Sequence, residues 1–234
     1  PTYTVKVVSD NGNKYRFDDY GTSAVTLNLH ESGTYTFDQS DSSNSGHPLR
    51  FSTTSDGTHG GGSEYTTGVT VTGVPGTAGA KTVIVVAASA PTLYYYCTVH
   101  SGMGGQANTN ATKGSSNFSG SIISTVSANP STGFSIATYT GDGAASATIG
   151  HGLGVAPKMI ILKSRSASST YWLVGHDSIG WTKGLYLNDT RAEAAYTPYW
   201  NDTAPTSSVF TLGNWGVDSN GSGSTYVAYS FFFF

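Results

Sequence analysis

The chain has 234 residues, of which only 11% are charged, and its formal net charge at pH 7 is −3. It contains no basic run, no apolar run of the ~18 residues that a membrane helix needs, and a single Cys. These features argue against a nucleic-acid partner, against membrane insertion and against an intramolecular disulfide.

Ser, Thr and Gly fill about 40% of the positions, a composition that also occurs in flexible linkers. Aromatic residues nevertheless make up 12% of the chain, whereas disordered chains contain few of them. The longest run of strong helix formers, residues 191–195, is too short to be a stable helix. Since β-branched and aromatic residues favour strands, we expect an all-β protein.

The first half of the chain contains short segments in which apolar and polar residues alternate, separated by turns rich in Gly, Asn, Asp and Ser. Such a series of short strands is typical of a Greek-key sandwich. The sequence begins at Pro1 without a start Met or a signal-peptide pattern, so we expect a processed N-terminus. We expect strands at residues 2–9, 24–29, 34–38, 47–52, 81–88 and 92–97.

Between residues 104 and 132 the composition shifts to Gly, Ser, Asn, Thr and Ala, although residues 121–123 could form a strand. We therefore expect two β-sandwich domains, over residues 1–107 and 133–234, joined by a Ser/Thr/Gly-rich linker over residues 108–132. Strands of the second domain are expected at residues 134–139, 158–163, 171–174, 184–187, 209–212 and 225–234.

A Cys-x2-His-x2-Met motif follows the last expected strand of the first domain and places Cys97, His100 and Met103 in one short loop. A further imidazole, His47, lies 50 residues upstream at the start of another expected strand. A thiolate, two imidazoles and a weak axial thioether form the ligand set of a type 1 copper site. One tight loop can present three of these side chains, and the fourth must come from a neighbouring strand. The sequence therefore predicts a candidate copper site at these four residues.

With these residues, the stretch 1–107 resembles the cupredoxin family. The resemblance implies that Cys97 supplies the thiolate, His47 and His100 the imidazoles, and Met103 the axial thioether of a bound copper ion. The chain departs from the family at Pro48, where cupredoxins usually have a residue whose backbone N–H bonds to the Cys sulfur. We expect fewer N–H···S bonds here and a lower reduction potential for bound copper.

A second interpretation of the same residues requires no metal. A lone buried Cys commonly serves as a small hydrophobic residue, and the His and Met side chains can fill structural roles. The cupredoxin-like fold is then a scaffold. Two other residues, His30 and His59, fit no ligand pattern and are expected at the surface.

No catalytic motif is recognisable in the sequence. Ser222 lies in a Ser/Gly loop instead of at the strand-to-helix turn of a nucleophile elbow. The Gly run at residues 60–62 lacks the Lys and the helix that follow a phosphate-binding loop. We therefore expect that the protein is not an enzyme.

The second half resembles a lectin-like β-sandwich domain, often jelly-roll in form, that is common in structural proteins of marine bacteriophages, especially cyanophages. The order of its segments carries this resemblance: residues 134–141, 149–154, 155–163, 171–172, 200–206, 209–213 and 226–231. In the first half, residues 37–41, 47–52 and 95–105 resemble cupredoxin-like modules of such virion proteins.

The paired resemblance implies a non-enzymatic virion structural protein, either a tail fibre or a capsid appendage or decoration, located at the virion surface. Its implied partners are further copies of the chain in a homo-oligomer, with a trimer suited to a fibre, and other virion proteins. A host-surface glycan is a further partner that this interpretation allows.

Two alternative functions remain open: a secreted type 1 copper electron-transfer protein and a carbohydrate-binding adhesin. The first does not explain the second half of the chain. The second would use aromatic side chains that stack on sugars, although such residues more often form the core of a strand-rich domain. The candidates are Trp172, Trp181, Tyr196, Tyr199, Trp200 and Trp215.

The chain ends with four Phe residues, 231–234. In a strand, alternation places two of these rings on each face of the sheet. We therefore expect both faces to be covered, by the domain itself or by a neighbouring chain.

Overall fold

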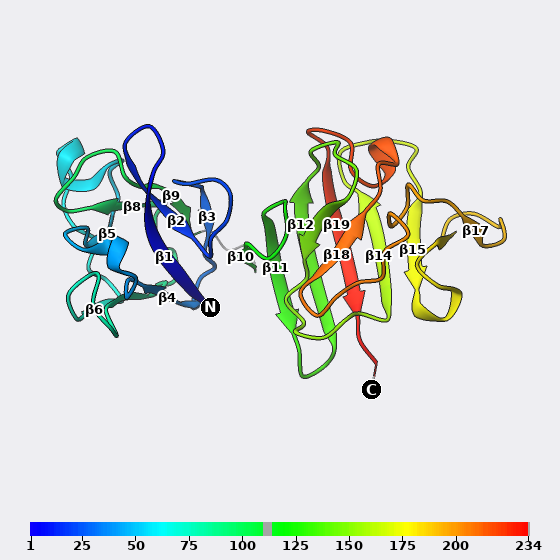
Figure 1. Cartoon of the computed structure of the whole chain (residues 1–234), viewed down its shortest axis with the longest axis horizontal. Helices are drawn as coiled ribbons and strands as arrows, with labels where there is room; N and C mark the ends of the chain where they lie inside the picture. Colours follow the sequence, from blue (N-terminus) through cyan, green and yellow to red (C-terminus); the bar gives the residue numbers. More distant parts are fainter. Residues whose placement is uncertain (110–113, 234) are drawn as a thin grey trace. The chain divides into compact units, whose positions relative to one another are not determined.

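The structure, a computed structural model, describes residues 1–109 and 114–233 (Figure 1). Within these ranges the regular structure is β-strand, apart from four short 3-10 helices: η1 (Ser42–Asn44), η2 (Gly57–Gly60), η3 (Asp177–Ile179) and η4 (Gly216–Asp218). None of them is long and apolar enough to cross a membrane. The predicted all-β fold is confirmed, and the chain divides into two compact units, Pro1–Ser115 and Ser116–Phe234.

The N-terminal unit consists of two β-sheets, with strand orders β2-β1-β4-β7-β6 and β3-β9-β8-β5. Both sheets are mixed, because β1 runs parallel to β4 and β3 runs parallel to β9, whereas the other pairs are antiparallel. The strands are β1 (Thr2–Ser9), β2 (Asn13–Phe17), β3 (Leu27–Asn28), β4 (Thr34–Asp38), β5 (Leu49–Ser52), β6 (Val69–Thr72), β7 (Lys81–Val85), β8 (Leu93–Cys97) and β9 (Gly105–Asn108).

Aromatic side chains form the core of the N-terminal unit and join its two sheets. Phe37 of the first sheet meets Phe51 of the second with ring centres 5.4 Å apart, and Phe17 meets Tyr95 at 5.2 Å. All four side chains are buried. Phe17 and Phe37 lie on strands in which buried and more exposed residues alternate, so a period of two turns one face of that sheet toward the other sheet.

The C-terminal unit contains an eight-stranded sheet of order β10-β11-β12-β19-β14-β15-β16-β17 and a two-stranded sheet, β13-β18. The pairs from β11 onward are antiparallel. The strands are β10 (Ser115–Asn117), β11 (Ser124–Asn129), β12 (Phe134–Thr140), β13 (Ala147–Gly150), β14 (Met159–Ser164), β15 (Trp172–His176), β16 (Lys183–Tyr186), β17 (Ala194–Ala195), β18 (Val209–Leu212) and β19 (Thr225–Phe231).

One hydrophobic cluster joins the two sheets of the C-terminal unit. Ile149 and Phe210 of the small sheet are fully buried in the same cluster as Leu162 and Leu173 of the large one. Two sheets that share a core in this way form a β-sandwich. The prediction of a second all-β sandwich is therefore confirmed.

The structure differs from the expected linker over residues 108–132, because β10 and β11 fall within it. The strand β11 pairs along its whole length with β12. The sequence pattern did not indicate β11, because Ser124 is buried where an apolar residue is usual. The Ser124 hydroxyl donates to the Gly150 carbonyl at 2.9 Å. A small hydroxyl whose hydrogen bond is satisfied can occupy a core position at little cost.

The terminal Phe residues are only partly covered by their own chain. Phe231 lies on β19 and packs against Phe134 with ring centres 5.1 Å apart. Phe233 stacks on Phe231 but is 55% exposed. Phe234 lies outside the described residues.

A buried histidine, His151, follows β13 and is held in one neutral form by two backbone groups. Its Nδ1 accepts the Leu153 N–H at 3.2 Å, so Nε2 carries the proton and donates to the Thr206 carbonyl, also at 3.2 Å. Burial lowers the pKa of His151, because a charged imidazole would be poorly solvated there. A proton on Nδ1 would also break the bond from Leu153.

This histidine predicts a pH dependence of stability for the C-terminal unit. Below a pH of about 6.5, the unfolded chain binds a proton at His151 that the folded unit does not, so the free energy of unfolding decreases as the pH falls. In the His151→Gln variant the decrease between pH 7 and pH 5 is expected to be smaller. Urea unfolding followed by Trp fluorescence measures this, because all four Trp residues lie between positions 172 and 215.

His176→Gln, which replaces the half-buried imidazole of the same unit, is the control that shows whether any His-to-Gln replacement has this effect. An equal pH dependence in wild type and His151→Gln would contradict the assignment.

Candidate metal centre

The pairing of β5 with β8 brings two distant parts of the chain together. The strands are antiparallel with Leu49 opposite Cys97, and the Thr98 N–H donates to the Pro48 carbonyl at 3.2 Å. His47 lies two residues before Leu49. It is therefore placed beside the loop that begins where β8 ends at Cys97.

His47, Cys97 and His100 form the candidate metal centre, in which one ligand atom of each lies within 4.8 Å of the others. The Cys97 Sγ is 3.9 Å from His47 Nδ1 and 3.8 Å from His100 Nδ1. With metal–nitrogen and metal–sulfur distances of roughly 2.0 and 2.3 Å, as in zinc sites, the N···S separation is about 3.7 Å for trigonal and about 3.5 Å for tetrahedral ligands. The observed separations are nearer the trigonal value, and the group is placed so that it could hold one metal ion.

The three side chains differ in burial in a way that suits a ligand role. Cys97 is fully buried, His47 is half-buried and His100 is exposed. Burial, and next the neighbouring His100, lower the pKa of His47. A lowered pKa keeps the imidazole neutral near pH 7, which is the form that binds metals.

The fourth predicted residue, Met103, lies in the same loop as His100 and its side chain is buried. Its carbonyl accepts the backbone N–H of Tyr15 at 2.9 Å. Tyr15 is buried too, and its pKa is raised, first by burial and then by the adjacent Cys97. The loop is thus fixed at Met103 by β2.

Two further residues hold this ligand loop, and neither stood out in the sequence. The Asp56 carboxylate accepts the Gly102 N–H at 2.9 Å and the Ser101 hydroxyl. The Lys14 amine donates to the Gly102 carbonyl. Asp56 precedes η2 with a left-handed φ of 57°, a conformation that no sequence pattern signalled.

The two histidines that fit no ligand pattern lie apart from the three ligand atoms. His59 is exposed, and its Nε2 lies 2.9 Å from the Cys97 carbonyl oxygen. His30 is half-buried beside Tyr35, with its Nδ1 2.7 Å from the Glu31 carbonyl oxygen. His59 therefore supports the backbone of the candidate metal centre without joining its ligands.

The Cys97 sulfur accepts one backbone hydrogen bond, from the Val99 N–H at 3.4 Å. Pro48, which directly follows His47, has no N–H to offer. The Cys97 sulfur therefore accepts a backbone hydrogen bond from the loop that follows β8, but Pro48 donates no hydrogen bond to it.

The donor set is compatible with copper, since a thiolate and two imidazoles are ligands that type 1 copper sites use. Met103 brings a thioether to the same loop, but the group that is placed to hold a metal consists of His47, Cys97 and His100. A structural zinc ion takes four strong ligands. In the described part of the chain, no group of three or more His, Cys, Asp or Glu side chains other than these three is placed to hold a metal.

The aromatic residues considered for sugar stacking do not form one exposed surface. Trp181, Trp200 and Tyr199 are buried in the core of the C-terminal unit, whereas Trp172 and Tyr196 are exposed. Trp215 is half-buried and packs against Tyr199 with ring centres 4.8 Å apart. Only part of the set is therefore accessible to a ligand.

Fold and site together define an all-β protein of two sandwich units with a candidate metal centre in the first. A family model described as "Domain of unknown function (DUF7483)" matches residues 106–232, and the chain belongs to this family. The matched residues begin after Met103, so the candidate metal centre lies outside them. No curated protein and no solved structure matches the chain.

The close approach at Gly104 predicts that the ligand loop tolerates no side chain there. A Cβ on Gly104 would lie 1.7 Å from the Tyr95 carbonyl oxygen and 3.0 Å from the Tyr96 Cα, both of them backbone atoms. Gly104→Ala should destabilise the N-terminal unit by about 1–3 kcal/mol, the usual cost of overpacking. Calorimetric unfolding measures the loss.

Gly21→Ala is the matched control, because a Cβ on Gly21 would meet nothing within 4 Å. If the two variants unfolded at the same temperature, the close packing of the loop against β8 would be wrong.

Proposed function

We propose that this chain is a non-enzymatic structural protein whose N-terminal unit binds one copper ion. His47, Cys97 and His100 would hold the ion, and Met103 of the same loop would be a further, weaker ligand. The observation that carries the proposal is the approach of one thiol and two imidazoles at N···S separations of 3.8 and 3.9 Å. When bound, copper would supply one-electron redox chemistry through its Cu(I) and Cu(II) states.

The surroundings of the three ligands support this proposal. The sulfur is buried and accepts a hydrogen bond from Val99, which stabilises a thiolate. The ligand loop is held in place at Gly102, whose N–H donates to the Asp56 carboxylate and whose carbonyl accepts from the Lys14 amine of β2. Because His100 is exposed, one edge of the centre is accessible to a metal ion from solvent.

A copper titration tests the metal site directly. One equivalent of Cu(II) should produce an intense visible thiolate-to-copper band, because charge moves from the Cys97 sulfur to the metal. Cys97→Ser should abolish the band. His30→Gln is the matched control, since the His30 imidazole lies beside the Glu31 carbonyl and outside the ligand set, and it should retain the band.

Absence of a visible band in the wild-type protein, or its persistence in Cys97→Ser, would exclude the proposed ligand set.

We further propose that the protein is part of a virus particle, as a tail fibre or as a capsid appendage at the virion surface. The proposal rests on the resemblance of both halves of the chain to modules of virion proteins, and the two compact all-β units agree with it. The partly exposed Phe233 offers an apolar contact for a second copy of the chain or for another virion protein. A host-surface glycan remains a candidate partner of exposed Trp172 and Tyr196.

Particle analysis tests this second proposal. The chain should be detected by mass spectrometry in purified particles of the virus that encodes it, and the isolated protein should form a homo-oligomer in native mass spectrometry. A monomeric chain that is absent from the particles would contradict the proposal.

A further inference from the structure

The buried side-chain amide of Gln39 forms hydrogen bonds to the residues on both sides of Pro48, which follows His47 of the candidate metal centre. Gln39 comes directly after β4 and is 1% exposed. Its Nε2 donates to the His47 carbonyl at 2.8 Å, and its Oε1 accepts the Leu49 N–H at 3.0 Å. One amide therefore binds the backbone on both sides of Pro48.

The two hydrogen bonds from Gln39 are needed because β5 is the edge strand of its sheet. At this end of β5 the Pro48 carbonyl accepts the hydrogen bond from β8, given by the Thr98 N–H. The N–H and carbonyl of the next residue, Leu49, therefore face away from β8. Leu49 is fully buried, and unpaired polar groups there would be costly. The Thr82 hydroxyl donates to the Leu49 carbonyl at 2.9 Å, and the Gln39 side-chain oxygen accepts the hydrogen bond from the Leu49 N–H.

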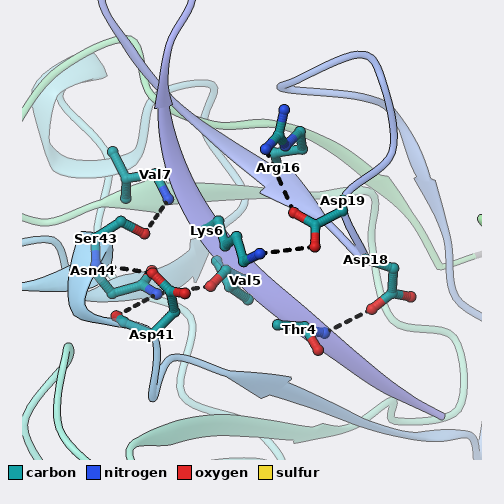
Figure 2. A network of polar contacts seen from close by, with 10 residues as sticks. All are labelled: Thr4, Val5, Lys6, Val7, Arg16, Asp18, Asp19, Asp41, Ser43 and Asn44. Carbon is teal, nitrogen blue, oxygen red and sulfur yellow. Dashed lines mark hydrogen bonds and ion pairs between the residues drawn. The ribbon is translucent and has the colours of Figure 1, made fainter.

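A second buried amide, Asn44, fixes the orientation of Gln39. The Asn44 Oδ1 accepts from Gln39 Nε2 at 3.3 Å, while its Nδ2 donates to the Val5 carbonyl at 2.7 Å and to the Asp41 carbonyl at 3.1 Å. Figure 2 shows Asn44 and Ser43 of η1 side by side against β1. The η1 turn thus anchors Gln39 to β1, in the sheet that does not contain β5.

The backbone of His47 is completely held by this arrangement. Its N–H donates to the Asn44 carbonyl at 2.8 Å. Its carbonyl accepts from Gln39 and also from the Tyr15 hydroxyl at 2.9 Å. Tyr15 binds Met103 through its own N–H, so the same residues position both ends of the predicted ligand set.

From this geometry we infer that Gln39 is a positioning residue of the metal centre, which holds His47 in a ligand-ready place before any metal binds. The inference rests on the proposed copper site and names a residue that acts through His47 without touching the ligand atoms. Groups behind a metal ligand typically change metal affinity 10- to 100-fold when they are replaced.

The first test compares Gln39→Met with the wild type by titrating copper(I) against a chromophoric chelator. Met preserves the volume of the side chain but removes both hydrogen bonds to the His47–Leu49 segment. The affinity should fall about 10- to 100-fold. Gln106→Met is the matched control: Gln106 is half-buried on β9 and bonds to Asn108, and its replacement should leave copper affinity unchanged.

A double-mutant cycle separates positioning from general loosening. If Gln39 acts through His47, then adding Gln39→Met to His47→Ala should lower copper affinity no further. A full additional loss in the double variant would overturn the inference. Should Gln39→Met fail to fold, Gln39→Asn replaces it, because Asn keeps an amide but is one methylene too short to reach both the His47 carbonyl and the Leu49 N–H.

A readout without metal keeps this inference separate from the copper proposal. In the metal-free wild-type protein the Leu49 amide should be protected from hydrogen exchange, and in Gln39→Met it should exchange about 10-fold faster. Wild-type protein that binds no copper would defeat the proposed function alone. Unchanged exchange at Leu49, or unchanged copper affinity in Gln39→Met, would defeat the positioning role.

Discussion

The antiparallel pairing of β5 with β8 is the constraint on which the candidate metal centre depends. It sets Leu49 opposite Cys97 and so places His47 at the entrance of the loop that carries His100. A shift of register by one residue would turn Leu49 from the core to the opposite face of the sheet, which its complete burial forbids. The hydrophobic core therefore specifies the position of the candidate ligands.

On the outer side of β5, where no neighbouring strand pairs with it, buried polar side chains supply the hydrogen-bond partners of its backbone. Gln39, Asn44 and Thr82 are all less than 2% exposed, and each bonds to backbone of this region or to another member of the group. Satisfied polar networks of this kind make a structure rigid, because every alternative arrangement leaves a donor or acceptor unpaired. We therefore expect the backbone around His47 to have the same conformation with and without a ligand.

The sequence predicted those features that local patterns encode. Cys97, His100 and Met103 stand in one loop at a recognisable spacing, and aromatic alternation revealed most strands. Sequence patterns missed β2, β6, β9, β13 and β17, of which β6 lies in an uncharged stretch without large side chains. They placed β10 and β11 in a linker, and β11 escaped notice because Ser124 occupies a core position. Gln39 could not be found from sequence, because its role depends on a contact with Leu49 that only the folded sheets create.

X-ray absorption at the copper edge of the loaded protein tests the central claim most directly, because it counts the atoms bonded to the metal. The account predicts one sulfur at short range and two imidazole nitrogens, with the sulfur lost in Cys97→Ser and one imidazole lost in His47→Ala. A copper environment of nitrogen and oxygen alone, unchanged by these substitutions, would contradict it.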